Sequence, residues 1–353
     1  MGKDPATGKR KQKRKRGFER KEDAERALAD FLSSLNKGDY IEPSKVTVEQ
    51  FMIDWIEGRK LHLKEITYLT YKNHITNHIV PHLGKIELAK LMPQHVSELH
   101  NVLHKKGLSG TSIQDVHKVL RNALGSAVKW GMIPKNVATM VDRPKADKSE
   151  IKIWTIEEAN QFLKAAKENT RYYIAFLLAL ATGMRQGEIL GLRWEDIDFD
   201  EGVIKVTQTL DHQGKKIHSE TKTKAGQRTI SIDKTTVEAL KSHKAKVAQE
   251  KLIAGSSYED NGLVVCTALG TPVSPRNLLR SFYATIKKAK VTKITFHELR
   301  HTHASILLKQ GVHIKVVQER LGHSDIKITL DTYSHLMPNM QKETAEKFAD
   351  VFY

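Results

Sequence analysis

The stretch from Tyr173 to Thr182 constrains the fold more than any other part of this chain, because it is apolar almost throughout. Residues 174–180 carry no polar side chain. A helix that is apolar on every side must be enclosed by other elements. We therefore predict a buried helix that runs into the turn Thr182-Gly183-Met184-Arg185.

A second region, before this helix, has the apolar periodicity of several amphipathic helices. Thr47, with Gln50 three residues later, indicates a helix N-terminus. Pro81 is expected to stop the second helix. The apolar positions predict four or five short helices, including ones at about 48–56, 68–79, 96–103 and 112–130.

Two segments without apolar periodicity divide the chain. Residues 37–46 contain Gly38 and Pro43, and residues 142–150 are mostly charged. We therefore expect an N-terminal basic element with a helix (1–42), a helical domain (43–141), a linker (142–150) and a C-terminal domain (151–353).

The C-terminal domain combines helices with a small sheet. Thr155 and Glu158 form a capping box at the start of one helix. The runs 202–206 and 228–232 have the composition of strands, with basic turns between them. The expected fold class is mainly α with a small antiparallel β-sheet, in a multidomain chain.

The charge of the chain points to a polyanionic partner. The 353 residues carry a net charge of +17, which favours nucleic acid as that partner. Part of this charge lies in Lys9, Arg10, Lys11, Lys13 and Arg14, which are candidate DNA contacts. The alternative is a basic tail without a fold of its own.

The cysteine count and the lengths of the apolar runs indicate the cellular location to expect. Cys266 is the single cysteine, so no internal disulfide can form, and a cytoplasmic location is expected. No apolar run reaches the roughly 18 residues of a membrane span, so no membrane partner is expected.

Polar residues on the second predicted helix of the helical domain are further candidates for phosphate contacts. Lys72 and Asn73 are the strongest of them. A solvated helix face is the alternative for each, and residue by residue it is the simpler interpretation.

Two basic residues are placed where they could meet a phosphate. Arg185 follows a glycine turn at the end of the buried helix and could donate to two phosphate oxygens. It could instead be a structural partner of Glu188 or Asp196. Lys222 lies in the predicted hairpin and could enter a groove of DNA or protonate a leaving oxygen, and Lys224 competes for this role.

Histidines and one tyrosine complete the candidate site. His297 and Arg300 are three residues apart and would share a helix face. His323 follows Gly322, and ten residues later Tyr333 has polar neighbours on both sides. We therefore expect Tyr333 to be exposed and able to act as a nucleophile on a phosphodiester.

Other chemistries are less compatible with these residues. His297 and His301 spell the zinc-protease pattern H-E-x-x-H, but Arg300 inside it would repel a cation. The sequence has no paired carboxylates for two metal ions and no Walker-type phosphate loop. We therefore expect a phosphoryl transfer that uses cationic donors and needs no metal, cofactor or ATP.

With these motifs the C-terminal domain resembles the catalytic domain of the tyrosine recombinases, in particular the integrases of phages and conjugative elements. The resemblance rests on Ala181–Glu188, Thr221-Lys222-Thr223, the H-x-x-R pair, Leu321-Gly322-His323 and Tyr333, in the order of the family. The helical domain is similar to the core-binding domain of that family. Gly8-Lys9-Arg10, Gly17-Phe18 and Ala24 resemble the end of its arm-site-binding domain, whose earlier strands we do not find, so we expect this module to be incomplete.

The resemblance implies a mechanism. Arg185 and Arg300 would bind the scissile phosphate, and His297 and His323 would donate hydrogen bonds or move protons. Tyr333 would form a 3′-phosphotyrosyl link, and Lys222 would protonate the departing 5′-oxygen.

It also implies partners, namely double-stranded DNA attachment sites, a homotetramer on two duplexes, and possible accessory or directionality factors. The alternatives are a type IB topoisomerase-like enzyme, a non-catalytic DNA-binding regulator with this fold and, least favoured, a metalloenzyme.

Overall fold

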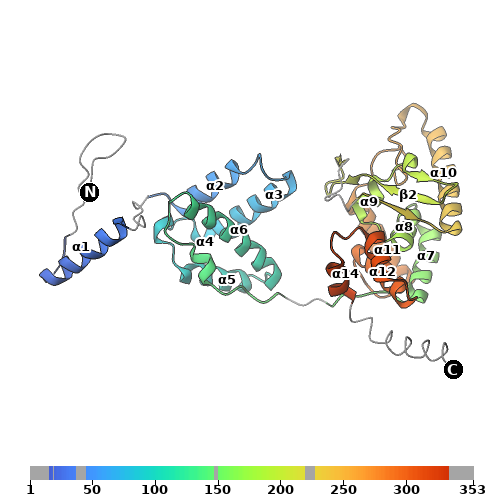
Figure 1. The fold of residues 1–353 in the computed structure, drawn as a ribbon. Coiled ribbons are helices and arrows are strands. Elements are labelled where there is room, and N and C mark those ends of the chain that lie inside the picture. Colours follow the sequence, from blue (N-terminus) through green and yellow to red (C-terminus); the bar gives the residue numbers. More distant parts are fainter. Residues whose placement is uncertain (1–15, 19, 37–44, 147–149, 219–226, 334–353) are drawn as a thin grey trace, which may run out of the picture. The chain divides into compact units, whose positions relative to one another are not determined.

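The computed structural model describes residues 16–18, 20–36, 45–146, 150–218 and 227–333 (Figure 1). The chain separates into two compact units, Met1–Ser149 and Glu150–Tyr353, which we call the N-terminal and the C-terminal unit. The division lies within the charged segment 142–150. Helix α1 (Lys21–Asn36) precedes the helical part of the N-terminal unit.

The N-terminal unit consists of helices around one apolar core. Its elements after α1 are α2 (Val48–Gly58), α3 (Glu65–His74), η1 (Ile75–Ile79), α4 (Val80–Leu83), η2 (Leu88–Lys90), α5 (Pro93–Lys105), α6 (Gly110–Lys129) and η3 (Val137–Met140). The prediction for the start of α2 is confirmed, because the amide of Gln50 donates to Oγ1 of Thr47 over 3.2 Å. The side chain of Gln50 bonds to Asp54 instead of returning to the cap.

The prediction that Pro81 stops the second helix is wrong. The chain widens into the π-helical turn η1 and continues into α4, with Pro81 in the first turn of that helix. Proline at the start of a helix costs little, because the first amides of a helix lack partners within it. The wider turn also keeps Ile75 and Ile79 fully buried.

Polar contacts lock the core of the N-terminal unit at two points. Trp55, 1 % exposed, donates from its indole nitrogen to Ser126 of α6 over 2.9 Å. His100 of α5 and His117 of α6 are buried and their rings share a hydrogen bond of 3.1 Å. These contacts fix α6 against its neighbours, as buried polar groups require partners.

The C-terminal unit is built around the helix predicted from the apolar run. Helix α8 spans Tyr173–Thr182, as predicted, and it packs on α7 and α12. The capping box at Thr155 and Glu158 is confirmed by reciprocal bonds of 3.2 and 3.1 Å. Among the described residues of this unit, the helices are α7 (Ile156–Asn169), α8, α9 (Gln186–Gly191), η4 (Trp194–Asp196), α10 (Lys234–Ala254), η6 (Gly255–Ser257), α11 (Pro275–Ala289), α12 (Phe296–Lys309), α13 (Ile314–Leu321) and α14 (Ile326–Tyr333).

Two small antiparallel sheets lie in the described part of the C-terminal unit. Strands β1 (Ile197–Asp198), β2 (Val203–Val206) and β5 (Arg228–Ser231) form one, in the order β1-β2-β5. Strands β3 (Thr209–Leu210) and β4 (Ile217–His218) form the other. The predicted strand pair is therefore confirmed, with Val203 opposite Ser231.

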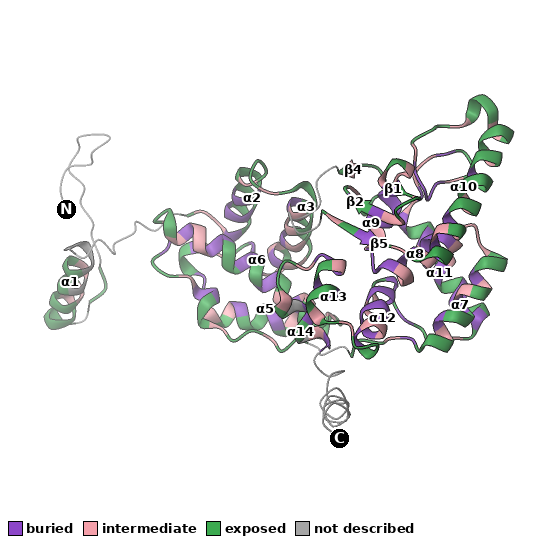
Figure 2. Ribbon diagram, turned by 45° about the vertical axis from the view of Figure 1, so that its right-hand side comes forward, coloured by how far each residue is buried: buried purple, intermediate pink, exposed green. Residues whose placement is uncertain are grey.

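Burial follows the predicted pattern in both units. Figure 2 shows buried residues along α8 and mainly exposed residues along α1 and the outer part of α10. In the C-terminal unit, aromatic rings pack around α8, among them Phe162, Phe176 and Phe282. Among the described residues, none of the helices combines the length and apolar character needed to span a bilayer.

Candidate active site

Two left-handed glycines bring the ends of α8 and α13 to one guanidinium group. Gly183 (φ 67°) ends α8, and Gly322 (φ 66°) ends α13. Arg300, from the second turn of α12, donates from Nη1 to the carbonyl of Gly183 over 2.7 Å and from Nη2 to that of Leu321 over 2.5 Å. Its side chain is almost completely buried. Burial and the charge of Arg185 lower the pKa of Arg300 to about 9, so it remains a cation at neutral pH.

Only glycine fits at the first of these turns. A Cβ at Gly183 would lie 2.8 Å from side-chain carbons of both His303 and Leu321. The His303 ring is itself fixed, because its Nδ1 bonds to the carbonyl of Leu180 over 2.7 Å and its Nε2 accepts from Arg320 over 3.1 Å. The turn that carries Arg185 is therefore packed against a fixed wall.

Arg185 is anchored at the start of α9 and remains accessible. Its Nη1 donates to Oε1 of Glu188, and its amide donates to Oε2, each over 2.8 Å. Arg228 of β5 contacts the same carboxylate through Nη2 over 2.9 Å and Nη1 over 3.2 Å. The Arg185 side chain is 41 % exposed, whereas Glu188 is 4 % exposed. The paired role and the phosphate-facing role considered for Arg185 are therefore compatible.

The charge of Glu188 is secured by its two arginine partners. Burial by itself raises the pKa of this carboxyl, but the hydrogen bonds and charge of Arg228, together with Arg185, outweigh it and lower the pKa to about 2. One buried carboxylate thus orients an exposed guanidinium on α9 and a buried one on β5.

The histidines of α12 and the loop after α13 lie within the field of these arginines. His297 is exposed, and its ring is 5.0 Å from that of His301 at an angle of 88°. Loss of hydration and the charges of Arg300 and Arg185 lower the pKa of His297. The same causes lower the pKa of His323 to about 4. These mutual effects show that the groups form one electrostatic cluster.

Tyr333 is buried, so the prediction that it is exposed is wrong. It ends α14 and is 1 % exposed, in an apolar cluster that includes Leu308, Val317 and Leu321. Its hydroxyl makes a hydrogen bond of 2.6 Å to Nδ1 of His301. Burial, opposed by the charge of Arg300, raises the pKa of Tyr333 to about 12. Its polar sequence neighbours gave no sign of this packing.

The structure therefore gathers most of the residues predicted for the active site. One cluster contains Arg185, His297, Arg300, His323 and Tyr333. Lys222 and Lys224 lie outside the described residues, and the chain is described again just before Arg228.

Sequence reasoning did not foresee the contacts that two further residues, Glu188 and His301, make beside this cluster. Glu188 was considered as a partner of Arg185, but its contact with Arg228, 40 residues away, has no local signal. His301 was considered only as part of a zinc pattern. Its position four residues after His297 on one helix was the available hint, since residues at that spacing share a helix face. Among the described residues, no group of three or more His, Cys, Asp or Glu side chains is arranged to hold a metal ion.

Comparison with known proteins decides the family. Residues 152–340 match the model of the phage integrase family, residues 47–104 match the N-terminal SAM-like domain of phage integrases, and residues 2–35 match an arm DNA-binding domain. The chain belongs to the phage integrase family. This protein is therefore a tyrosine recombinase, an enzyme of site-specific recombination, as its predicted motifs indicated.

Similar proteins cover nearly the whole recombinase. A tyrosine recombinase XerC-like protein of Caldanaerobacter subterraneus subsp. tengcongensis is 32 % identical, covering 94 % of this chain and 90 % of that protein. The ICEBs1 integrase of Bacillus subtilis is 29 % identical, covering 99 % and 95 %. A solved structure of a Tn1549 transposon integrase variant in complex with transposon right end DNA has a TM-score of 0.72 and 25 % identity, covering 86 % of this chain and 99 % of that one.

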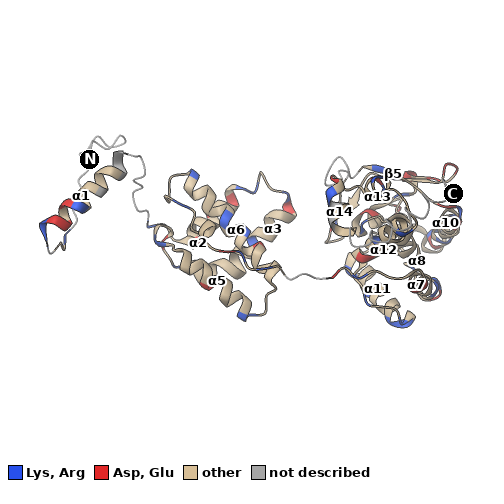
Figure 3. Ribbon diagram, turned by 60° about the horizontal axis from the view of Figure 1, so that its bottom comes forward, with Lys and Arg blue, Asp and Glu red and all other residues tan. Residues whose placement is uncertain are grey.

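The N-terminal unit of the recombinase has a basic groove along α6. The groove has a volume of about 830 Å³. Its cationic lining residues are Arg59, Lys118, Arg121, Lys129 and Arg143. Figure 3 shows the positions of Lys and Arg along the ribbon of this unit. The signal available in the sequence was the spacing of Lys118, Arg121 and Lys129 on one helix face.

The candidate DNA contacts predicted for this unit, Lys72 and Asn73, do not line the groove. Asn73 is exposed on α3. Lys72 is half exposed, but its ammonium already contacts Glu57 over 3.1 Å and the hydroxyl of Tyr68 over 3.2 Å. Its charge is thus partly compensated within the protein. Lys9, Arg10, Lys11, Lys13 and Arg14 lie outside the described residues.

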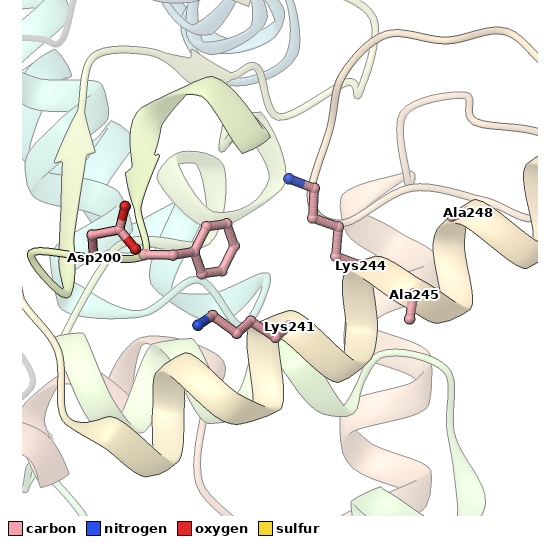
Figure 4. Close-up of a pocket in the computed structure, with 6 residues that line it drawn as sticks. Asp200, Lys241, Lys244, Ala245 and Ala248 are labelled. Atoms are coloured by element: carbon pink, nitrogen blue, oxygen red, sulfur yellow. The ribbon is translucent and has the colours of Figure 1, made fainter.

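A second depression, of about 390 Å³, lies on the C-terminal unit between the β1–β2 turn and α10 (Figure 4). Phe199 forms part of its wall, and the ammonium groups of Lys241 and Lys244 lie 6.0 and 5.2 Å from that ring. Ala245 and Ala248 line the helix side. The depression shares no lining residue with the arginine and histidine cluster.

Proposed function

We propose that this recombinase integrates and excises a mobile genetic element by cutting and rejoining double-stranded DNA through a 3′-phosphotyrosyl intermediate on Tyr333. The observation that supports this most strongly is the cluster of two arginines and two histidines, from α9, α12 and the loop after α13, beside a tyrosine at the end of α14. Such a set suits metal-independent transfer of a phosphoryl group, because cationic donors stabilise charge on the phosphate oxygens.

The scissile phosphate would be bound by Arg185 and Arg300. Both guanidinium groups are fixed before DNA arrives, Arg185 by Glu188 and Arg300 by the carbonyls of Gly183 and Leu321. Each contact uses only part of the donors of a guanidinium group, which has five N–H groups. Donors fixed in advance need little reorganisation in the transition state, which is the main advantage of such a site.

The histidines would complete the binding of the phosphate. Because their pKa values are lowered, His297 and His323 are neutral at pH 7 and can each both donate and accept a hydrogen bond. We propose that they donate to phosphate oxygens that gain charge in the transition state. We assign protonation of the departing 5′-oxygen to Lys222, on the strength of the family motif.

The chemical sequence would then conserve the energy of the phosphodiester bond. The Tyr333 oxygen bonds to phosphorus, and the bond to the 5′-oxygen breaks. The free 5′-hydroxyl of a second strand then attacks the phosphotyrosyl link, which releases Tyr333 and exchanges the strands. Because the intermediate is a covalent ester, rejoining needs no ATP. The buried position of Tyr333 implies that DNA binding makes its hydroxyl accessible.

We propose that the N-terminal unit holds the DNA duplex through the groove along α6. Its five cationic side chains line one groove, where they can neutralise phosphates of a bound backbone. The domains would be an arm-type DNA-binding element (1–42), a core DNA-binding domain (43–141), a linker (142–150) and a catalytic domain (151–353). We further propose a homotetramer on two duplexes in the cytoplasm, with accessory or directionality factors that control the direction of recombination.

The test of this function is a covalent capture assay. Duplexes that the wild-type protein binds are first selected from a randomised pool and are then given a nick beside the cleavage position. The wild-type protein should form an adduct that survives denaturant, and peptide mapping should locate it at Tyr333. The variant Tyr333→Phe should bind the same duplex and form no adduct.

The matched control is Tyr283→Phe, which changes an exposed tyrosine of α11. This variant should form the adduct at the wild-type rate. An adduct formed by Tyr333→Phe would refute the assignment of the nucleophile. Relaxation of supercoiled DNA without any exchange of strands between duplexes would favour the topoisomerase-like alternative.

A further inference from the structure

The hydroxyl of Tyr333 points at a histidine that is not part of the family motif. Its oxygen lies 2.6 Å from Nδ1 of His301, and the two ring centroids are 5.7 Å apart. His301 follows Arg300 on α12 and lies one helical turn after His297. His323 makes its own hydrogen bond elsewhere, from Nδ1 to the hydroxyl of Thr329 over 2.9 Å. Among the described residues, His301 is therefore the histidine in place to exchange a proton with Tyr333.

The surroundings of this pair fix its geometry. The ring of Tyr333 is enclosed by Ala304, Leu308 and Val317, so the apolar walls exclude water that could compete for the hydroxyl. A hydrogen bond in such a setting is stronger than one at the surface. The contact therefore directs the phenolic hydrogen or a lone pair of the oxygen toward one ring nitrogen.

The charged groups around His301 keep its ring neutral. Burial and the positive charges of His297 and Arg300 lower the pKa of His301 to about 4, against an opposing effect of Glu298. His323 is also near enough to interact electrostatically with His301. At neutral pH a neutral imidazole thus contacts a neutral phenol, and an imidazole in that state can accept a proton.

We propose that His301 is the general base for Tyr333, taking the phenolic proton on Nδ1 as the tyrosine oxygen bonds to phosphorus. This inference rests on the proposed function. The Tyr333 O–H bond breaks while the bond from that oxygen to phosphorus forms, and the 5′-oxygen leaves with a proton from its own acid. In the reverse reaction the protonated His301 returns the proton to the departing tyrosine oxygen.

DNA binding would itself activate this base. In the free protein, transfer of the proton from Tyr333 to His301 is strongly unfavourable. A bound phosphodiester brings a negative charge next to Arg185 and Arg300. That charge offsets the cations that disfavour an imidazolium at His301, and attack on phosphorus removes the basicity of the phenolic oxygen. The base is thus weak until substrate is present, which limits unproductive ionisation of Tyr333.

The test uses His301→Asn, because the side-chain oxygen of asparagine can replace Nδ1 as a hydrogen-bond acceptor but cannot take up the proton. Single-turnover adduct formation is measured on the selected nicked duplex. We expect a loss of about 10²- to 10⁴-fold, the usual contribution of a general base. The rate of the variant should then rise with pH as hydroxide replaces the missing base. His212→Asn, at an exposed histidine, should leave the rate unchanged.

A duplex with a 5′-bridging sulfur in place of the leaving oxygen separates the base from the acid. Sulfur leaves without a proton, so this duplex restores variants that lack the acid but should not restore His301→Asn. With the same duplex, the wild-type rate should rise with pH as His301 loses its proton and should then level off. Both the rise and the plateau should fall within the range from about pH 5 to about pH 9. His301→Gln provides the same comparison should the Asn variant not fold, and the wild-type pH profile needs no variant.

The outcomes are distinct. A His301→Asn or His301→Gln variant with the wild-type rate, or rescue by the bridging sulfur, would overturn the role of His301 as base. A wild-type profile without a rising limb on the sulfur duplex would overturn it as well. An adduct with Tyr333→Phe would instead refute the proposed function, and the role of His301 with it.

Discussion

The stability of the C-terminal unit should depend strongly on the buried carboxylate of Glu188. It is 4 % exposed and accepts hydrogen bonds from Arg185 and Arg228, the latter with a side chain only 6 % exposed. Removing one partner of a buried ion pair typically destabilises a protein by about 3–5 kcal/mol. We therefore expect Glu188→Gln to lower the free energy of unfolding of this unit by roughly 3 kcal/mol at neutral pH.

The pH dependence provides an independent magnitude. The folded-state pKa of Glu188 is about 2, below its ordinary value of 4.5. The contribution of Glu188 to the free energy of unfolding is therefore fully present at pH values above its ordinary pKa and is lost as the pH falls toward 2. The difference corresponds to about 3 kcal/mol. Over this range the wild-type protein should lose that much stability through Glu188, and Glu188→Gln should not.

The measurement is a urea titration read by hydrogen exchange in peptides of α8 and α9, so that unfolding of the N-terminal unit does not contribute. The matched control is Glu195→Gln, whose partner Arg193 lies 3.2 Å away in an exposed pair. Exposed pairs contribute at most about 1 kcal/mol. Equal effects of the two substitutions, or a Glu188→Gln variant as stable as the wild type, would refute this account of Glu188.

Three further outcomes follow from the structure. Gly183→Ala should destabilise the C-terminal unit more than Gly107→Ala destabilises the N-terminal unit, and it should also slow adduct formation, because both glycines have positive φ but only Gly183 of the two lacks space for a Cβ. Urea titration and covalent capture measure these effects, and equal losses of stability would contradict the prediction. Arg121→Ala should weaken DNA binding and reduce the slope of log affinity against log salt concentration by about 1, because Arg121 lines the groove. Lys85→Ala, at an exposed lysine outside the groove, should change neither, and fluorescence anisotropy at several salt concentrations tests both variants. Burial and the nearby His100 lower the pKa of His117 from 6.5 to about 4, so acidification over that pH range should reduce the free energy of unfolding of the N-terminal unit by up to roughly 3 kcal/mol. A stability profile that is flat over this range would count against this prediction.

Much of the local structure was predictable because its causes lie within a few residues of each other. The apolar run gave α8 with its observed bounds, and Thr155 with Glu158 gave a capping box that forms as expected. The H-x-x-R pair lies on a helix, so the shared face of His297 and Arg300 followed from helical spacing. Pro81 was misjudged because the cost of a proline depends on its place in the turn, and a π-helical turn changed that place.

Residue patterns alone were sufficient to predict the mainly helical fold, the small antiparallel sheet, the family and the identity of the basic residues that form the cluster. Three contacts became visible only in the folded protein. Tyr333 is buried against His301, Glu188 accepts hydrogen bonds from arginines of α9 and β5, and Arg300 joins the ends of α8 and α13. The physical reason is the distance along the chain. A cap or a helix face is set by neighbours three or four residues away, whereas these partners are brought together by the packing of the whole unit.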